Sequence, residues 1–235
     1  MAPDPDPRVT LAAANNADLY QVVFRGHGLR FRRSDNAFVA VDQPPPYYSQ
    51  MTVLSPDDPE AILAEVDALA QRAEAVVGLK DGFSTLDLTG RGFETLFDAQ
   101  WIWRAPQSAQ PTWKVVSSAA GLDCWEAAWK RGGSPTDVRM FPPDMLGDAS
   151  VAFLANWDGD QIVAGCIANL SPDCVGVSNV FGSDAFAAAA KAVGALYPTL
   201  PIVGYESGPD IENAIRAGFE TIGTLRIWIM PKDRA

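Results

Sequence analysis

The chain contains a single histidine, His27, among its 235 residues. Mechanisms that need two histidines are therefore excluded, and so is almost every metal site built on imidazole ligands. His27 has no nucleophile beside it, and we interpret it as a loop or surface residue. The three cysteines, Cys124, Cys166 and Cys174, lack metal-like spacing and predict neither a disulfide framework nor a zinc site. We expect no metal cofactor.

Basic residues are scarce, with 18 lysines and arginines against 29 aspartates and glutamates and a net charge of -11. A nucleic-acid partner needs a basic face. The only basic cluster consists of Arg25, Arg30, Arg32 and Arg33, which we interpret as the solvated face of a hairpin. We therefore expect no nucleic-acid partner.

Long hydrophobic runs are missing as well. No stretch of about 18 apolar residues exists, which argues against a membrane-spanning helix. Residues 1–7 read MAPDPDP and lack the basic region and apolar core of a signal peptide. With 48% hydrophobic and 20% charged residues, the composition is that of a globular protein. We expect a reduced, cytoplasmic setting without a membrane partner.

The chain does contain an internal repeat. Residues 76–96 read VVGLKDGFSTLDLTGRGFETL and residues 202–222 read IVGYESGPDIENAIRAGFETI, at an offset of 202 − 76 = 126 with seven of 21 positions identical. A strand-like run and a helix with an acidic or hydroxyl start precede each block. The runs are residues 47–54 and 174–180, and the helices begin at residues 57–60 and 183–184.

The repeat predicts two similar α/β units packed on one another. The first would comprise residues 1–106 and the second residues 107–235, joined by a Pro/Gln/Ser linker at residues 105–112. The alternative is a single domain in which the match is a coincidence.

The second unit has the clearer order of elements: strand, helix, three meandering strands, helix, strand, helix, strand. Asp158-Gly159 is a hairpin dipeptide, and Gly218 suits the end of the last helix. The expected strands are residues 113–116, 151–157, 161–170, 174–180, 200–206 and 220–230, and the expected helices are residues 122–130, a segment starting at 183, and residues 209–217.

This order resembles that of the GNAT acyltransferase superfamily, in which a helix ends in a Gly-Phe pair before the last strand. The likeness is strongest over residues 175–230, above all in AGFETIG at residues 217–223, and weaker over residues 28–106. The resemblance implies an α/β (α+β) fold with two tandem GNAT-like units, each a mixed, mostly antiparallel sheet flanked by helices. It implies that the first unit is degenerate.

The resemblance also implies a place for acetyl-CoA or another acyl-CoA as co-substrate. In the family two strands splay apart, and the pyrophosphate lies on amides at the start of the next helix. The family's glycine loop is reduced here to Gly182, and Asp184 places a carboxylate near the expected phosphate. Ser183 and Asp184 acting only as a helix cap is the alternative. The implied cofactor-binding residues are Val177, Asn179, Val180, Phe181, Gly182, Ser183 and Asp184.

Acyl transfer to an amine needs a base for the incoming ammonium and often an acid for the departing thiolate. Many family members carry a tyrosine four residues before the Gly-Phe pair, where this chain has Ala214 and, in the first unit, Leu88. Glu206, at the mouth end of its strand, is the candidate base, and Tyr205 is the second catalytic candidate. A solvated, non-catalytic Glu206 is the alternative.

Two functions of different classes follow. The first is an N-acyltransferase that moves an acyl group, such as acetyl, from acyl-CoA to a small-molecule or amino-terminal amine by direct attack. The second is a catalytically inactive GNAT-like fold that binds a small ligand or a protein partner. Gly182 and its helix start favour the first, whereas the reduced loop and the absent tyrosine favour the second. The acceptor, the acyl group and the oligomeric state stay open.

Overall fold

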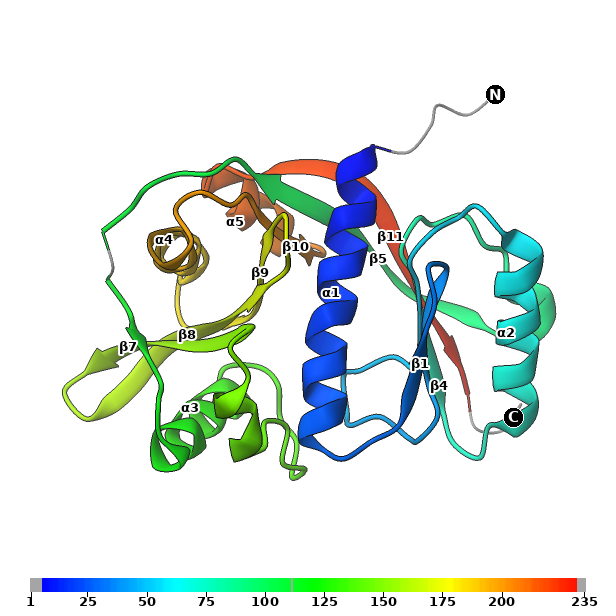
Figure 1. Ribbon diagram of the computed structural model, residues 1–235, viewed down its shortest axis with the longest axis horizontal. Coiled ribbons are helices and arrows are strands. Elements are labelled where there is room, and N and C mark those ends of the chain that lie inside the picture. Colours follow the sequence, from blue (N-terminus) through cyan, green and yellow to red (C-terminus); the bar gives the residue numbers. More distant parts are fainter. Residues whose placement is uncertain (1–5, 111, 232–235) are drawn as a thin grey trace.

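A computed structural model describes residues 6–110 and 112–231. Residues 1–5, part of the N-terminal segment that lacks signal-peptide features, lie outside the described residues. Pro111 of the expected linker lies outside them as well. The described chain forms one mixed, mostly antiparallel sheet of 11 strands together with five α-helices (Figure 1). The α/β fold class expected from the sequence is confirmed at this level.

The helices are α1 (Pro7–Gly26), α2 (Pro59–Arg72), α3 (Ala119–Arg131), α4 (Phe186–Leu196) and α5 (Asp210–Arg216), with short 3₁₀ turns at Thr89–Arg91 and Pro143–Gly147. The strands are β1 (Phe31–Arg33), β2 (Ala37–Ala40), β3 (Met51–Val53), β4 (Val77–Asp81), β5 (Glu94–Arg104), β6 (Lys114–Val115), β7 (Val151–Asp158), β8 (Gln161–Leu170), β9 (Val175–Phe181), β10 (Ile202–Glu206) and β11 (Glu220–Met230). Their order in the sheet is β1-β2-β3-β4-β11-β5-β10-β9-β8-β7-β6, and only β3/β4 and β9/β10 are parallel pairs among the described strands.

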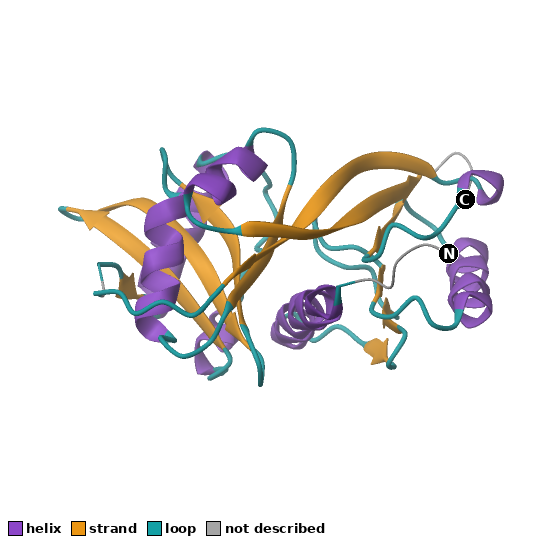
Figure 2. Ribbon diagram, turned by 90° about the horizontal axis from the view of Figure 1, so that it is seen from above, coloured by secondary structure: helices purple, strands orange, loops and turns teal. Residues whose placement is uncertain are grey.

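Helices cover both faces of the sheet (Figure 2). Successive side chains of a strand point to opposite faces. On β10, Val203 therefore packs in the core that includes Phe24 of α1, whereas Ile202 packs in the core that includes Val193 of α4. By the same contacts α3 lies on the α1 face, and α2 lies on the α4 face.

Capping side chains explain where three of the helices begin. The Asp6 carboxylate accepts a hydrogen bond from the Arg8 amide at 2.9 Å, with Pro7 in the first helical position of α1. Asp58 caps α2 through the Ala61 amide at 3.0 Å, and Ser118 caps α3. The start predicted for α2 is confirmed, whereas α1 was not predicted from the sequence.

Glycines end two elements as the sequence predicts. Gly159 has φ 57° in the hairpin between β7 and β8, and Gly218 has φ 88° after α5. Both conformations favour glycine because it has no Cβ. The following Phe219 is buried and packs edge-on against Phe186 of α4 at 5.5 Å between ring centroids. This contact fixes α5 and β11 relative to α4.

The long strands β5 and β11 lie side by side in the middle of the sheet and pass behind α1 in Figure 1. β5 lies between β11 and β10, and β11 lies between β4 and β5. Their register pairs Ala99 with Leu225, and 225 − 99 = 126 is also the offset of the sequence repeat. The last strand of each half therefore lies beside a strand of the other half: β5 lies next to β10, and β11 lies next to β4.

Two separate units packed on one another are not evident, contrary to the expectation from the repeat. The four central strands β4, β11, β5 and β10 join the halves into one sheet. The residue pattern of a strand records which face is buried but not which strand lies beside it, so the sequence did not reveal this exchange. The duplication and the boundary after residue 106 stay predictions.

Candidate functional site

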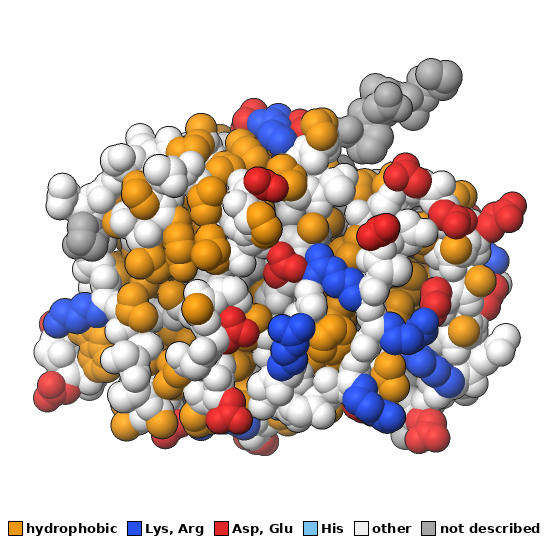
Figure 3. Space-filling view, in the orientation of Figure 1, with side chains coloured by type: hydrophobic (Ala, Val, Ile, Leu, Met, Phe, Trp, Pro, Cys, Tyr) orange, Lys and Arg blue, Asp and Glu red, His pale blue; other side chains and the backbone are white. Residues whose placement is uncertain are grey.

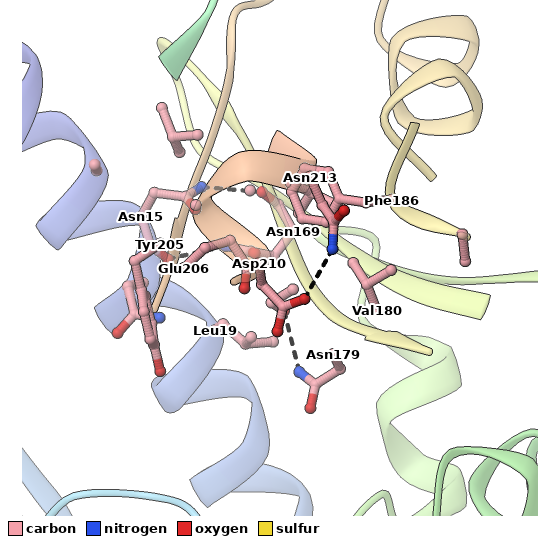
Figure 4. Close-up of a pocket in the computed structure, with 18 of the residues that line it drawn as sticks. Asn15, Leu19, Asn169, Asn179, Val180, Phe186, Tyr205, Glu206, Asp210 and Asn213 are labelled. Atoms are coloured by element: carbon pink, nitrogen blue, oxygen red, sulfur yellow. Dashed lines mark hydrogen bonds between the residues drawn. The ribbon is translucent and has the colours of Figure 1, made fainter. Parts of the chain in front are cut away.

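The parallel strands β9 and β10 separate after two residue pairs. Val175 pairs with Ile202 and Gly176 with Val203, and the pairing then ends although both strands continue. A cavity of about 540 Å³ lies between and around the separated ends (Figure 4). The sheet therefore contains the open gap that the resemblance implies between these strands.

A β-bulge shapes the β9 side of this cavity. The register with β8 shifts between the pairs Ile167–Ser178 and Gly165–Phe181, and Asn179 takes a left-handed conformation with φ 52°. A bulge leaves a residue outside the ladder and re-aims the backbone around it. It therefore frees backbone polar groups of β9 beside the cavity for contact with a ligand.

Most of the predicted cofactor-binding residues lie at the cavity, although no contact with a cofactor follows from that. Phe181 does not line the cavity, because its buried ring packs against Trp125 of α3 at 5.1 Å between ring centroids, and its cofactor-binding role stays a prediction. Ser183 does not line the cavity either. The predicted residues that do line it are Val177, Asn179, Val180, Gly182, Asp184, Tyr205 and Glu206.

The start of α4 differs from the expected Ser183 cap. The helix begins at Phe186 without a side-chain cap, and the Ser183 hydroxyl instead donates to the Asp184 carboxylate at 3.4 Å. Gly182 (φ 109°) and Asp184 (φ 49°) both have positive φ in the turn that leads into the helix, and Ala185 rather than Ser183 takes the N-cap position. The first amides of a helix have no partner within the helix and favour anions. The uncapped end at the cavity is therefore suited to a phosphate.

Gly182 is required for this turn. A Cβ at this position would lie 2.6 Å from the Ala164 Cβ and 2.8 Å from the Val163 carbonyl oxygen. The chain can therefore leave β9 close against β8 only with glycine here. The sequence prediction that Gly182 is the retained glycine of the loop fits this geometry.

Glu206 lies at the end of β10, half-buried, on the wall of the cavity. Burial, and secondarily the nearby Asp210 carboxylate, raise its pKa to about 8. Asn213 donates to Asp210 at 3.0 Å and so orients that second carboxylate (Figure 4). A carboxylate with a pKa near neutrality can accept a proton from a bound ammonium group.

Tyr205 also lines the cavity, but on the α1 side of the sheet (Figure 4). Its ring meets Trp101 edge-on at 5.6 Å between centroids, and the Lys80 ammonium lies 4.3 Å from its centroid. Lys80 lowers the pKa of Tyr205, whereas burial and Tyr20 raise it, and the net direction is upward. The phenol therefore stays protonated and is a potential proton donor.

Helix α1, which the sequence analysis missed, forms one wall of the cavity through Asn15, Asn16, Leu19 and Tyr20. The Asn15 side chain donates to the Asn169 carbonyl oxygen at 3.0 Å, and the Asn169 side chain donates to the Asn15 carbonyl oxygen at 2.9 Å. These reciprocal bonds attach α1 to β8 beside the cavity. The sequence signal for α1 was Asp6-Pro7, a cap followed by a first-position proline.

Further residues complete the cavity without any local sequence signal. Tyr47 and Tyr48 come from the loop between β2 and β3, Trp129 comes from α3, and Asp210 and Arg216 come from α5. These segments meet only in the folded chain, so their convergence has no local pattern in the sequence.

The lone histidine and the cysteines take no part in this site. His27 follows α1 and its Nε2 lies 3.0 Å from the Met140 carbonyl oxygen, outside the cavity. Cys124, Cys166 and Cys174 are free thiols. Residues 6–110 and 112–231 hold no group of three or more histidine, cysteine, aspartate or glutamate side chains placed to bind a metal ion.

The basic cluster is largely neutralised by acids. Arg30 pairs with Asp42 at 2.6 Å, and Arg32 pairs with Glu65 at 2.8 Å. Arg33 pairs with Asp18. Figure 3 shows blue side chains next to red ones over α1 and β1. In the part of the chain that the structure describes, no helix is both long and apolar enough to cross a bilayer.

Comparisons with known proteins bear on this geometry. The sequence matches no protein-family model and no curated protein sequence. By structure, the chain is similar to a GCN5-related N-acetyltransferase from Kribbella flavida, with a TM-score of 0.63, 15% identity, and coverage of 94% of this chain and 95% of the other. A GCN5-related N-acetyltransferase from Sphaerobacter thermophilus matches with a TM-score of 0.52 at 13% identity, covering 99% and 97%.

A third similar structure is the Saccharomyces cerevisiae N-myristoyltransferase with bound myristoyl-CoA, with a TM-score of 0.54, 9% identity, and coverage of 92% and 76%. The chain has a GNAT-like fold. At these identities the likeness concerns the fold alone, and function has to be argued from the site.

Proposed function

We propose that the protein is an N-acyltransferase that moves an acyl group, such as acetyl, from acyl-CoA to a small-molecule or amino-terminal amine. The observation that carries the proposal is the open cavity between β9 and β10, which brings an uncapped helix start and Glu206 to one site. A binding surface for anions and a group that accepts protons are both needed for this reaction.

The residues around α4 fit the co-substrate. The amides at the start of α4 suit the pyrophosphate, and Gly182 lets the backbone turn tightly there. The bulge at Asn179 offers backbone groups of β9 to the pantetheine arm. The bound thioester would supply the activated acyl group, and the GNAT-fold neighbours, including the structure with bound myristoyl-CoA, support this assignment.

Glu206 is assigned as the general base. Its carboxylate would take a proton from the acceptor ammonium, which frees the nitrogen lone pair to attack the thioester carbonyl carbon. A C–N bond then forms as the C–S bond breaks, without a covalent enzyme intermediate. The raised pKa of Glu206, about 8, makes its carboxylate basic enough for this transfer.

Tyr205 is assigned as the acid that protonates the departing thiolate. Its phenol replaces the family tyrosine that is missing at Ala214, which is fully buried and belongs to the core between α4 and the sheet. One tyrosine proton then goes to the sulfur and one ammonium proton goes to Glu206, while the second proton that the nitrogen loses on forming the amide returns through solvent to the Tyr205 phenolate, so the protons balance. Tyr205 and Glu206 are consecutive residues on opposite faces of β10, a placement that separates the two proton transfers.

We also infer that the two halves derive from one duplicated unit, of which only the second kept an open cleft. The offset of 126 shared by the sequence repeat and by the Ala99–Leu225 pair supports this inference. One CoA molecule per chain is therefore expected in isothermal titration calorimetry. Two equivalent CoA sites would contradict the assignment of the first half as closed.

Thermal unfolding with CoA thioesters tests the proposal most directly. At a ligand concentration a hundred times Kd, binding stabilises the folded state by about 2.7 kcal/mol. For a chain of this size that corresponds to a rise in Tm of about 5–10 °C. Acetyl-CoA should also release free thiol when a mixture of primary amines is added. No rise in Tm with acetyl-CoA or myristoyl-CoA at millimolar concentration would contradict the proposal.

The alternative is a ligand-binding GNAT fold without transfer chemistry. The exposed Asp184 carboxylate at the start of α4 favours it, because this charge opposes a phosphate there. Under this alternative CoA still raises Tm, but no amine releases thiol from acetyl-CoA. Saturable thiol release that depends on the amine would rule the alternative out.

A further inference from the structure

A lysine is buried beside the α1 side of the cavity. Lys80 of β4 is 1% exposed, and its ammonium donates to the Asn16 side-chain oxygen at 2.7 Å. The same ammonium lies 4.3 Å from the ring centroid of Tyr205 and 4.9 Å from that of Tyr20. None of the ion pairs among the described residues involves Lys80.

A buried charge without a partner of opposite sign destabilises a folded protein. Burial lowers the pKa of Lys80, but the Tyr20 and Tyr205 side chains raise it and the net direction is upward, so the ammonium stays charged beside the Asn16 oxygen and the two tyrosine rings. Among the described residues, no carboxylate within ion-pair distance neutralises this positive charge. Buried, incompletely compensated charges of this kind are found preferentially at functional sites.

An unsatisfied hydroxyl, that of Tyr48, belongs to a ring that packs on Tyr20, the same tyrosine that the Lys80 ammonium approaches. The Tyr48 hydroxyl is buried and has no hydrogen-bond partner, and its ring packs against Tyr20 at 4.8 Å between centroids. Tyr48, Tyr20, Tyr205 and Asn16 all line the cavity. Burial raises the pKa of Tyr48, so its hydroxyl stays a hydrogen-bond donor. Together with Lys80 these four residues form what we call the tyrosine–lysine chamber.

We propose that the tyrosine–lysine chamber binds a carboxylate group of the amine that accepts the acyl group. This inference rests on the proposed function and narrows the acceptor to an amine that also carries a carboxylate, as amino acids do. The Tyr48 hydroxyl supplies a hydrogen bond, and Lys80, behind the tyrosine rings, supplies the positive charge that an anion needs.

The distribution of charge in the cavity supports this orientation of the acceptor. The acids of the cavity wall, Asp184, Glu206 and Asp210, lie before α4, at the end of β10 and at the start of α5. Arg216 of α5 also lines the cavity and pairs with Glu212 at 3.6 Å. Lys80 lies on the opposite, α1 side. An amine with a carboxylate therefore finds acidic groups for its ammonium and donors for its carboxylate. A plain amine would leave the Tyr48 hydroxyl unpaired and would gain nothing from Lys80.

Binding of a simple carboxylate tests the chamber without CoA. Hexanoate, titrated into the full-length protein and followed by thermal shift, should give a saturable rise in Tm, whereas the uncharged analogue hexanamide should not. Tyr48→Phe should raise the Kd for hexanoate about tenfold, which is the loss of one good hydrogen bond. Lys80→Met should remove the saturable shift. Tyr197→Phe, a tyrosine outside the cavity, should bind hexanoate like the wild type.

If Lys80→Met does not fold, Tyr48→Phe still tests the proposal, because Tyr48→Phe removes only a hydroxyl oxygen that has no hydrogen-bond partner. Equal shifts with hexanoate and hexanamide, or an unchanged Kd in Tyr48→Phe, would overturn the proposal. A second arm compares 4-aminobutyrate with n-butylamine as acceptors. The acid should be preferred at least tenfold in kcat/KM, and Tyr48→Phe should reduce that preference.

The experiments separate this inference from the proposed function. A hexanoate site that depends on Tyr48, in a protein that does not bind CoA, supports the chamber and contradicts acyl transfer. CoA binding and amine acylation without any carboxylate preference support acyl transfer and overturn the chamber.

Discussion

The ends of β4 and β10 occupy matching positions in the sheet but have different surroundings. Asp81, the last residue of β4, pairs in register with Arg226, and Glu206, the last residue of β10, pairs with Gln100. Because 206 − 81 = 125, the repeat offset of 126 aligns Asp81 with Ser207 and Glu206 with Lys80. The Asp81 carboxylate accepts hydrogen bonds from the Leu86 amide at 2.8 Å and the Phe83 amide at 3.3 Å. Glu206 faces the cavity, and no hydrogen bond lowers its pKa.

The glycine after each strand shows the same difference. A Cβ on Gly82 would lie 2.6 Å from the Val53 carbonyl oxygen, so the chain after β4 lies directly against the end of β3. A Cβ on Gly208 would meet nothing within 4 Å. The helix starts agree, since Asp58 caps α2 whereas α4 has no side-chain cap.

The packing at the strand ends and the capping of the helix starts decide which half can bind a ligand. In the first half the strand ends, the acid and the helix start are all satisfied by the chain itself. In the second half the corresponding groups are open to a cavity. Polar groups that the fold leaves unsatisfied are the ones available to a substrate.

Among the substitutions that distinguish the two halves, Glu206→Gln should have the largest effect on the rate of amine acylation. Loss of the general base should lower kcat for amine acylation by roughly 10²- to 10⁴-fold. Asp81→Asn, at the end of β4, should leave the rate per folded molecule unchanged but lower stability by about 1–3 kcal/mol. Thiol release and urea unfolding measure the two effects. A rate loss in Asp81→Asn equal to that of Glu206→Gln would break the distinction between the halves.

The raised pKa of Glu206 predicts a pH dependence of the rate. Since the carboxylate is the active form, kcat/KM should rise about tenfold per pH unit up to about pH 8 and then level off. Measurement from pH 6 to pH 9 should show this slope in the wild type and its absence in Glu206→Gln. A flat wild-type profile would exclude Glu206 as the base.

The raised pKa of Glu206 also predicts that the folded state becomes less stable as pH rises, whereas the rate increases. The folded pKa of about 8 lies above the unfolded value of about 4.3. Between these values the folded state binds more protons, so this contribution to stability is complete below about pH 4.3 and declines as pH rises to about 8. Urea unfolding at pH 5 and pH 8 should show a smaller loss in Glu206→Gln than in the wild type.

Local patterns in the sequence predicted much of the second half. The last strand has the predicted bounds, residues 220–230, and the Asp158-Gly159 hairpin lies where it was expected. The longest helix, α1, was missed because alanines and valines are buried around much of its surface and two asparagines interrupt its middle. Helical periodicity is weak under such conditions, although Asp6-Pro7 marked the start.

The candidate site was predicted where it depends on one segment and missed where it depends on several. Gly182 and Glu206 follow from neighbouring residues, and both lie at the cavity. The Ser183 cap was wrong because the helix begins only at Phe186, after a turn with positive φ at Gly182 and Asp184 that the residue types alone do not specify. The meeting of Lys80 with Tyr205 depends on the exchange of β5 and β11, which no local pattern encodes.

Substituting alanine for Gly82 or Gly208 tests how closely other atoms pack against the chain after β4 and after β10. Gly82→Ala should cost about 3 kcal/mol of stability, because the new Cβ meets a backbone oxygen that cannot move away easily. Gly208→Ala has open space, and only its left-handed conformation, φ 54°, should cost about 1–2 kcal/mol. Urea unfolding of the two variants provides the comparison. Equal losses would mean that the two strand ends are closed to the same degree.

Asp184→Asn should give the smallest effect and tests the helix start directly. Asparagine tolerates the left-handed conformation at this position, φ 49°, and removes one negative charge beside the uncapped amides of α4. Removing a charge of this sign near a helix start is worth about 0.3–1 kcal/mol to a bound anion, so CoA should bind roughly two- to fivefold more tightly by calorimetry. Asp58→Asn, at the capped start of α2, should leave CoA binding unchanged. Weaker CoA binding in Asp184→Asn would show that the phosphates do not lie on the α4 amides, because only there does the Asp184 charge oppose them.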